Sequence, residues 1–314
     1  MKTGLLIDQD FCLHDPGDDH PEAPGRIRAI IKALEDAGLP ESCHPIAGRE
    51  VTDDEIRLAH TDDYLKTVLS EIDGTRAGML STGDTHFGPH SLRIARNAAG
   101  GLLSAVDGVI SGELKNAFCA VRPPGHHATS DRGMGFCIFN NAAIAARYAR
   151  EAYGLERVAI VDWDVHHGNG TQDIFYEDGK TFYFSTHQHP WYPGTGSKDE
   201  TGTGNGHNTT LNVPLPAGSG MEEIGAAFRS SFTAKMKDYK PDLVIISAGF
   251  DSRLGDPLGQ LTLSDDDFAS LTRILCDLAG EFADGRLVSV LEGGYNQEGL
   301  GSAVAHHLTS LMEA

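Results

Sequence analysis

The stretch Ala159-Ile-Val-Asp-Trp-Asp-Val-His-His-Gly-Asn-Gly170 contains the residues on which our interpretation of this chain depends. It begins with an apolar run that is typical of a buried strand. The run then gives way to four groups that bind metals or protons, namely Asp162, Asp164, His166 and His167. Carboxylates and imidazoles this dense would be unfavourable at the end of a buried strand unless a cation held them together. The stretch therefore predicts a metal site at the mouth of a parallel sheet.

Length and composition indicate an ordinary globular protein, because 40% of the 314 residues are apolar and 22% are charged. We predict one domain spanning residues 1–314. No run of residues approaches the roughly 18 apolar residues of a membrane span, and the first residues do not resemble an export signal. We therefore expect no membrane partner.

The charge and the cysteines restrict the partners and the compartment. A formal charge of −20 argues against nucleic-acid binding and would attract a cationic small molecule or a basic peptide, although it could equally serve solubility alone. The five cysteines are scattered, odd in number and never arranged as Cys-x-x-Cys. This usage favours a reducing compartment, so we predict a cytoplasmic location.

Strand patterns alternate with helix patterns along the chain. Apolar strand-like runs occupy residues 117–121, 157–161, 243–247 and 287–291, and helical patterns occupy residues 91–110, 140–153, 222–239 and 264–282. The alternation predicts an α/β fold in which helices cover both faces of a single parallel sheet. Such sheets bind ligands at the carboxyl ends of their strands. Four of the predicted strands are followed there by polar groups: His126-His127, the Asp162–His167 segment, Asp251 and Tyr295.

Asp164, His166 and Asp251 are the predicted metal ligands. Three protein ligands leave a coordination position for water or substrate, as a catalytic zinc site requires. A second ion would need further ligands, but Gly168 and Arg253 stand at the positions that could supply them. We therefore expect one catalytic ion. Mixed oxygen and nitrogen ligation suits Zn²⁺ and does not exclude Fe²⁺, Co²⁺ or Mn²⁺.

Two adjacent histidines are the predicted proton-transfer groups. If Asp162 lies behind His126, its carboxylate favours the charged imidazole; if Asn169 lies behind His127, its amide fixes the tautomer without adding charge. His127 would then titrate at lower pH and act as general base and afterwards as general acid. Tyr295 follows two glycines and could donate a hydrogen bond to an oxyanion opposite the metal.

Two other histidine pairs receive structural interpretations. His306-His307 lies among apolar residues in the last predicted helix, and we interpret it as part of a helix face. His187-Gln-His189 lies in a predicted loop from residue 186 to residue 208 that is rich in Gly, Pro and His. We expect this second pair at the rim of the site, although it could also be an additional metal pair.

These motifs together resemble the zinc-dependent histone deacetylase and acetylpolyamine amidohydrolase superfamily, which has the arginase/deacetylase fold. The resemblance rests on Arg122-Pro-Pro-Gly-His-His-Ala128, Gly135-Phe-Cys-Ile-Phe-Asn-Asn141, the Asp162–Gly170 segment, Ser247-Ala-Gly-Phe-Asp251 and Leu291-Glu-Gly-Gly-Tyr295. The motifs appear in the family's order, and His20-Pro21-Glu22 with Pro24 and Arg26 extends the match towards the N-terminus. Asn169, where other members have Asp, is similar to class II and bacterial deacetylase-like members.

The resemblance implies roles for individual residues. Asp164, His166 and Asp251 would bind the metal, and Tyr295 would polarise the carbonyl. Gly135 would accept a hydrogen bond from the substrate amide, and Phe136 and Tyr192 would wall a narrow tunnel. Asp84 would be a rim carboxylate that holds the substrate backbone, and Leu258 would line the entrance. Family members also bind structural K⁺, here through the Asp162, Asp164 and His166 carbonyls with Ser185 and Thr186.

The leading hypothesis is hydrolysis of the amide of an acetylated amine, with acetyl-lysine peptides and acetylpolyamines both open as substrates. An arginase-like ureohydrolase shares the sheet, but Gly168 and Arg253 argue against it. A non-catalytic acyl-lysine reader is a third possibility, against which the intact histidine pair, Tyr295 and metal ligands argue. The sequence leaves the native metal and the oligomeric state open.

Overall fold

One parallel sheet organises the chain in this computed structural model, which describes residues 2–314. In sheet order, the eight strands are β2 (His44–Pro45), β1 (Lys2–Ile7), β5 (Leu114–Ala120), β10 (Leu287–Leu291), β9 (Leu243–Ala248), β6 (Val158–Asp162), β7 (Thr181–Gln188) and β8 (Thr210–Leu215). Every neighbouring pair in this sheet is parallel. The four central strands β5, β10, β9 and β6 are almost entirely buried, which explains why they are continuous apolar runs.

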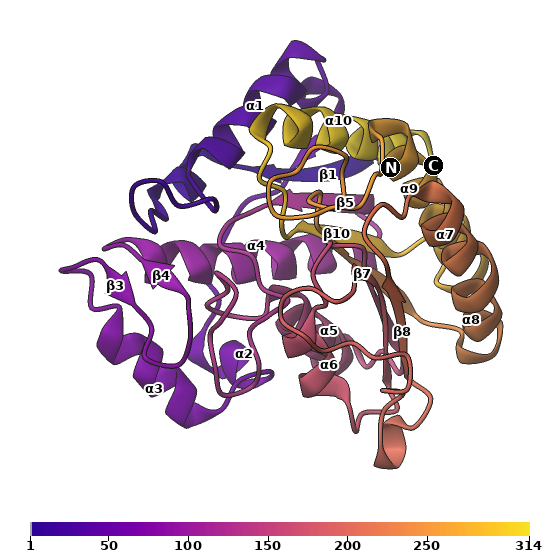
Figure 1. Cartoon of the computed structure of the whole chain (residues 1–314), viewed down its shortest axis with the longest axis horizontal. Helices are drawn as coiled ribbons and strands as arrows, with labels where there is room; N and C mark the ends of the chain where they lie inside the picture. The colour runs from indigo at the N-terminus through magenta and orange to yellow at the C-terminus, as the bar shows by residue number, and fades with distance from the viewer. Residues whose placement is uncertain (1) are drawn as a thin grey trace.

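Helices cover both faces of the sheet, as predicted (Figure 1). On one side α1 (Gly25–Asp36) packs on α10 (Gln297–Glu313), which packs on α9 (Asp265–Phe282). On the other side α4 (Ser91–Ile110) packs on α5 (Asn141–Tyr153), and both contact strands of the sheet. The remaining helices are α2 (Asp53–Arg57), α3 (Asp62–Glu71), α6 (Asn169–Phe175), α7 (Met221–Ala226) and α8 (Thr233–Tyr239), with short 3-10 turns η1 (Gln9–Leu13), η2 (Pro40–Ser42) and η3 (Gly204–Gly206).

Helix boundaries follow local sequence signals. Thr52 forms a capping box with Glu55, and Thr61 caps α3 by accepting a hydrogen bond from the Tyr64 backbone N–H. Asn140 caps α5, which ends at Gly154 in the left-handed conformation. These short-range signals could be interpreted without tertiary information, because both partners of each cap lie within four residues.

Two predicted elements differ in the structure. The helix expected over residues 222–239 contains a π-helical turn, η4 (Ala227–Phe232), between α7 and α8. The wider turn lets Phe228 and Phe232 both pack on Phe184, with ring centroids 5.0 and 4.6 Å apart. The predicted start of the loop at residue 186 is also wrong. Strand β7 continues to Gln188, which pairs with Leu215 of β8.

A small antiparallel hairpin lies outside the main sheet. Its strands β3 (Gly78–Met79) and β4 (His86–Phe87) are only two residues long, and the periodicity of the sequence did not predict them. Figure 1 shows the hairpin near α3, away from the eight strands. The segment between its strands contains Asp84, so the hairpin contributes to the site described below.

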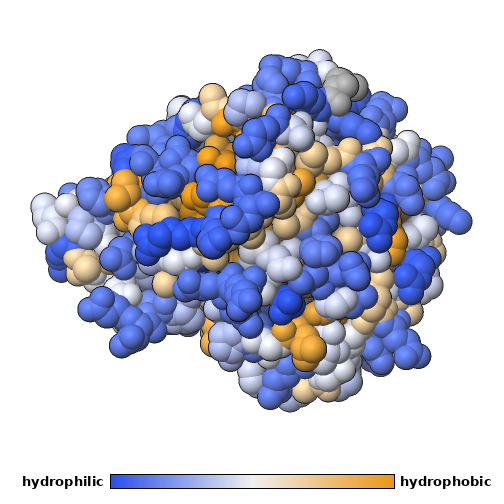
Figure 2. All heavy atoms as spheres, turned by 90° about the horizontal axis from the view of Figure 1, so that it is seen from above, coloured by the Kyte–Doolittle hydropathy of each residue, from blue (hydrophilic) through white to orange (hydrophobic). Residues whose placement is uncertain are grey.

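The surface is polar, with few large apolar groups. Figure 2 shows a face that is mostly hydrophilic and interrupted by small, separate hydrophobic patches. The exposed large hydrophobic residues are Leu13, Leu69, Met79, Tyr153, Trp191, Tyr192 and Leu254. Within residues 2–314, no helix is both long and apolar enough to cross a membrane.

Candidate active site

The carboxyl ends of the inner strands bring the predicted polar groups together. Asp162 at the end of β6 is paired in register with Ser247 of β9 on one side and with Ser185 of β7 on the other. The segments that follow β5, β6, β9 and β10 therefore begin at the same edge of the sheet. These are the segments that carry the histidine pair, the Asp-x-His motif, Asp251 and Tyr295.

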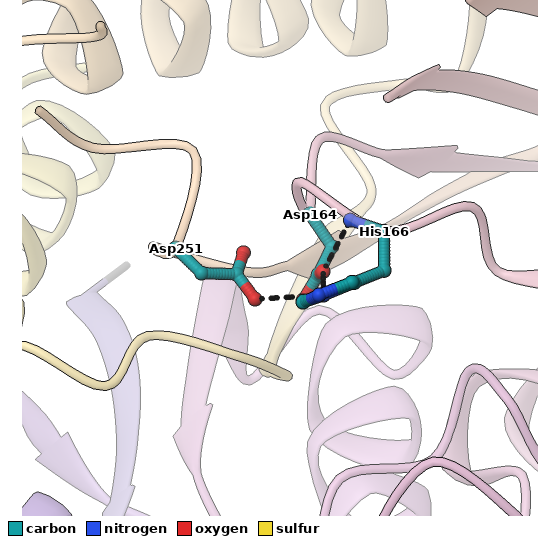
Figure 3. A group of neighbouring side chains, drawn as sticks. All are labelled: Asp164, His166 and Asp251. Carbon is teal, nitrogen blue, oxygen red and sulfur yellow. Dashed lines mark hydrogen bonds and ion pairs between the residues drawn. The ribbon is translucent and has the colours of Figure 1, made fainter. Parts of the chain in front are cut away.

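Asp164, His166 and Asp251 form one cluster, in which one ligand atom from each lies within 4.8 Å of the others. His166 Nδ1 lies 3.0 Å from Asp164 Oδ1 and 3.2 Å from Asp251 Oδ2 (Figure 3). All three side chains are buried, and Asp251 Oδ2 makes no hydrogen bond. A buried carboxylate oxygen without a donor is unfavourable unless a cation binds it. The cluster thus fits the predicted metal ligand set.

The electrostatics of this cluster also suit a cation. Burial and the nearby Asp164 carboxylate raise the pKa of Asp251 to about 7. Burial alone would lower the pKa of His166, but the adjacent Asp164 and Asp251 carboxylates raise it to about 10. The two carboxylates thus hold a proton on His166, and the same negative charge would favour a divalent ion in place of that proton.

Backbone donors hold Asp164 and Asp251 in place. The Gly293 N–H donates to Asp164 Oδ2 at 2.9 Å, and the Val165 N–H donates to Asp251 Oδ1 at the same distance. A Cβ atom at position 293 would lie 2.0 Å from Asp251 Oδ2, so only glycine fits there. Gly293 therefore makes room for the carboxylates of the candidate metal ligands Asp164 and Asp251.

The two histidines have different partners, as the sequence predicted. His126 Nδ1 lies 2.9 Å from Asp162 Oδ2, and His127 Nδ1 lies 2.8 Å from Asn169 Oδ1. Burial lowers the pKa of both imidazoles, but the charges of Asp164 and Asp162 reverse this effect for His126 and raise its pKa. For His127, burial and the neighbouring His126 and His166 together lower the pKa. The pair thus has one imidazole that favours the charged form and one that favours the neutral form.

A cavity of about 290 Å³ reaches these residues from the surface. Its lining consists of Asp84, His127, Gly135, Phe136, His166, Trp191, Tyr192, Pro257, Leu258 and Tyr295. All five residues that the resemblance assigned to substrate binding are therefore brought together in one cavity. The ring of Tyr192 stands edge-to-face on His127 at 5.1 Å, and the ring of Phe136 stands edge-to-face on Tyr295 at 6.0 Å.

Sequence reasoning missed Trp191 and Pro257 in this lining. Trp191 is 38% exposed, and its indole N–H donates to the Leu258 carbonyl at 2.8 Å. Trp191 comes directly before Tyr192, a predicted tunnel residue, and this adjacency in the sequence could have indicated that Trp191 also lines the cavity.

Sequence reasoning also assigned no role to Glu292, which is fully buried behind the histidine pair. Its carboxylate accepts hydrogen bonds from the Gly125 and His126 backbone N–H groups at 2.6 and 3.1 Å, and from Ser247 Oγ at 3.0 Å. Burial raises its pKa to about 7. Glu292 thus connects the backbone of the histidine pair to β9, the strand that precedes Asp251.

A buried ionic cluster supports the backbone beneath Tyr295. Arg122 makes two hydrogen bonds to the Glu22 carboxylate, and Arg26 makes a third to the same side chain. Arg26 also donates to the Gly294 and Glu292 carbonyls, both at 2.6 Å, and its guanidinium lies 4.9 Å from the centre of the Tyr295 ring. This cluster links the N-terminal segment to the Gly293–Tyr295 turn.

Of the two remaining histidine pairs, only His187-Gln-His189 differs from its predicted placement, because His306-His307 lies in α10, the last helix, as predicted. His187 belongs to β7 and is fully buried, with Nε2 2.9 Å from the Gly196 carbonyl oxygen, so it is no rim residue; His189 is exposed.

In the other pair, His307 is fully buried between Thr272 and Ser289, with its ring 5.6 Å from that of Trp163. Only His306 lies towards the surface, 3.8 Å from Asp266. Neither pair joins the metal cluster.

A family match covers almost the whole chain. Residues 20–311 match the histone deacetylase domain. This chain belongs to the histone deacetylase domain family. The finding confirms the resemblance that the five motifs indicated.

Individual relatives agree with this assignment. The chain is 42% identical over 306 residues to histone deacetylase 15 of Arabidopsis thaliana, covering 94% of this chain and 54% of that protein. It is 38% identical over 327 residues to the mouse polyamine deacetylase HDAC10, covering 99% of this chain and 48% of the relative. The chain thus spans about half the length of these two relatives. The crystal structure of the HDA15 HD domain superposes with a TM-score of 0.94 at 38% identity, covering 100% of this chain and 89% of that one. This likeness confirms the predicted fold class.

Proposed function

We propose that this chain is a metal-dependent hydrolase that removes an acetyl or related acyl group from an amine. The observation that carries the proposal is the convergence of Asp164, His166 and Asp251 on one buried point, where His166 also lines a narrow cavity together with His127 and Tyr295. Family membership supports the same conclusion.

The residues fit a divalent ion. Asp251 Oδ2 has no hydrogen-bond donor, and the two carboxylates and one imidazole match the ligands of catalytic zinc sites. We propose Zn²⁺ as the cofactor, and the same ligand types would accept Fe²⁺ or Co²⁺. When bound, such an ion would polarise a carbonyl group and lower the pKa of a water molecule.

His127 is the proposed general base. Asn169 Oδ1 accepts from Nδ1–H of the neutral imidazole, so Nε2 is left with a free lone pair. That nitrogen can take a proton from the attacking water and later deliver it to the leaving amine. His126, which favours the charged form beside Asp162, would stabilise the negative charge that develops during attack.

Tyr295 and Gly135 are the proposed contacts to the scissile amide. The Tyr295 hydroxyl would donate to the carbonyl oxygen as negative charge develops on it. The Gly135 carbonyl would accept from the amide N–H, and Phe136 and Tyr192 would enclose the alkyl stem that joins this amide to the rest of the substrate. Leu258 would line the entrance.

The proposed substrates are acetylated amines with a slender stem, either an acetylpolyamine or an acetyl-lysine peptide. The small cavity volume supports a stem without branches, and the charge of −20 would attract either cationic substrate. The deciding experiment compares kcat/KM for acetylputrescine, acetylspermidine and an acetyl-lysine peptide with zinc-loaded protein. Acetate release from any one of them supports the proposal, and none from all three contradicts it.

The alternatives have less support. Within residues 2–314, the structure contains one group of three possible ligand residues and no second group for a two-metal ureohydrolase. Arg253 Nε lies 2.6 Å from Asp265 Oδ1, so this cationic side chain forms an ion pair and does not act as a metal ligand. Urea release from arginine or agmatine would favour this alternative, and metal-loaded protein without any acetate release would favour a non-catalytic acyl-lysine reader. The K⁺ site, the cytoplasmic location and the single domain spanning residues 1–314 stay predictions.

A further inference from the structure

A turn with unfavourable backbone angles forms one wall of the cavity. Gly135 and Phe136 both have left-handed backbone conformations, with φ values of 56° and 68°. This conformation is costly for a phenylalanine, so the surrounding structure must hold it in place. A Cβ atom at position 135 would lie 2.3 Å from His127 Cδ2, which means that the turn packs directly against the proposed base.

Asp84 holds this turn from outside. Its Oδ1 accepts a hydrogen bond from the Gly135 N–H at 2.7 Å, and hydrogen bonds to a charged carboxylate are stronger than those between neutral groups. The same segment makes two more contacts: Thr82 Oγ1 lies 3.2 Å from both the N and the O atom of Gly133, and Thr85 Oγ1 donates to the Cys137 carbonyl at 3.1 Å. Three side chains between β3 and β4 thus hold residues 133–137.

Tyr192 connects the opposite wall to the same carboxylate. Its hydroxyl lies 3.2 Å from Asp84 Oδ2 and 3.4 Å from Asp84 Oδ1, while its ring contacts His127. The Asp84 carboxylate therefore receives donors from both walls, one from the Gly135 backbone and one from Tyr192. None of these contacts needs a bound substrate.

We propose that Asp84 and Tyr192 are positioning residues that hold the Gly135–Phe136 turn and thereby place both the Gly135 carbonyl and the Phe136 ring. This inference rests on the proposed function, and it goes beyond the substrate contact that the resemblance implies for Asp84. A rim carboxylate that only bound a peptide backbone would matter for peptide substrates alone. A residue that holds the wall matters for every substrate that enters the cavity.

The kinetic test compares substrates with and without a peptide backbone. We expect Asp84→Ala to lower kcat at least about tenfold for both acetylputrescine and an acetyl-lysine peptide, because the Gly135 carbonyl would be misplaced in the transition state. Asp84→Asn keeps an acceptor oxygen and should recover most of this loss. Tyr192→Phe keeps the ring and should cause a smaller loss, again on both substrates. A loss confined to KM for the peptide would overturn the proposal.

The chain offers a matched control pair. Tyr153 is 40% exposed, and its hydroxyl donates to Asp107 at 2.8 Å, away from the residues that line the cavity. Asp107→Ala and Tyr153→Phe remove the same chemical groups as Asp84→Ala and Tyr192→Phe. Both control variants should leave kcat and KM unchanged, and a loss equal to that of the test variants would also overturn the proposal.

A second readout does not depend on turnover. Amide hydrogen exchange over residues 133–137 should be faster in Asp84→Ala than in the wild type, Asp84→Asn or Asp107→Ala. Unchanged exchange in Asp84→Ala would contradict the positioning role. If the zinc-loaded wild type releases no acetate from any substrate, the proposed function fails, and the exchange measurement still decides whether Asp84 holds the turn.

Discussion

Asn169 Oδ1 lies 2.8 Å from His127 Nδ1 and gives this imidazole a neutral partner. The adjacent His126 has the Asp162 carboxylate at a similar distance. The carboxylates of Asp164 and Asp162 raise the pKa of His126, whereas burial and the neighbouring His126 and His166 lower the pKa of His127, whose amide partner adds no charge.

Placing a carboxylate beside His127 should change the pH dependence of turnover. Asn169→Asp adds a negative charge at Nδ1, which favours the charged imidazole and raises the pKa of the proposed base. The base is then protonated up to a higher pH, so the acidic limb of the kcat/KM profile should move to higher pH. An acidic limb that stays in place or moves to lower pH would contradict the role of His127.

Removing the two histidines separately should distinguish their roles. His127→Ala removes the proposed base and should lower kcat by about 10²–10⁴-fold. His126→Ala should cost less, because it removes only charge stabilisation. Steady-state acetate release measures both, and the assignment is wrong if His126→Ala abolishes turnover while His127→Ala leaves it nearly intact.

Tyr295→Phe removes one hydroxyl and retains the ring that faces Phe136 and Arg26. If the hydroxyl donates to the developing oxyanion, kcat should fall by about 10²–10³-fold with little change in KM. An unchanged kcat would exclude this role.

Metal binding should stabilise the protein more strongly as pH rises. The folded metal-free protein keeps protons on His166, whose pKa is raised to about 10, and on Asp251, whose pKa is raised to about 7. Both folded pKa values exceed the unfolded ones, so the stability that these protons contribute is lost as pH rises towards 10. Zinc must displace the protons, and this costs less at higher pH. The zinc-induced increase in Tm should therefore grow between pH 6 and pH 9, and an increase that shrinks over this range would argue against these ligands.

The buried Arg122–Glu22 pair should matter far more for stability than a surface pair. Arg122→Ala leaves the Glu22 carboxylate with one fewer cation in a fully buried site and should cost about 3–5 kcal/mol of unfolding free energy. Arg57 makes exposed ion pairs with Asp54 and Asp62 and serves as the control. Arg57→Ala should cost about 1 kcal/mol or less in the same urea titration. Equal losses of unfolding free energy would show that the buried cluster stabilises the protein no more than the surface ion pairs do.

The sequence predicted those parts of the site whose signals are local. Asp164 and His166 lie two residues apart at the end of an apolar run, and His126-His127 follow a Pro-Pro-Gly turn, so each group could be placed on a strand end. Parallel topology then brought the strand ends together, which explains why Asp251 could be joined to the cluster from far along the chain.

Contacts between distant segments could not be predicted in the same way. Glu22 and Arg122 are 100 residues apart, and nothing in either motif shows that they form an ion pair. The interaction of Asp84 with Gly135 depends on a hairpin with two-residue strands, which is too short to give a periodic signal. We predicted His187 in a loop because the sequence after residue 188 has a loop-like composition, which made the last residues of β7 difficult to recognise as strand.

The most direct test of the central claim is a zinc titration of metal-free protein followed by acetate release from an acetylated amine. We predict no turnover without metal, a linear rise to one equivalent of zinc and then a plateau, and no recovery in Asp251→Ala at the same zinc concentrations. Full turnover in the metal-free protein, or full recovery in Asp251→Ala, would contradict the claim that Asp164, His166 and Asp251 hold one catalytic ion.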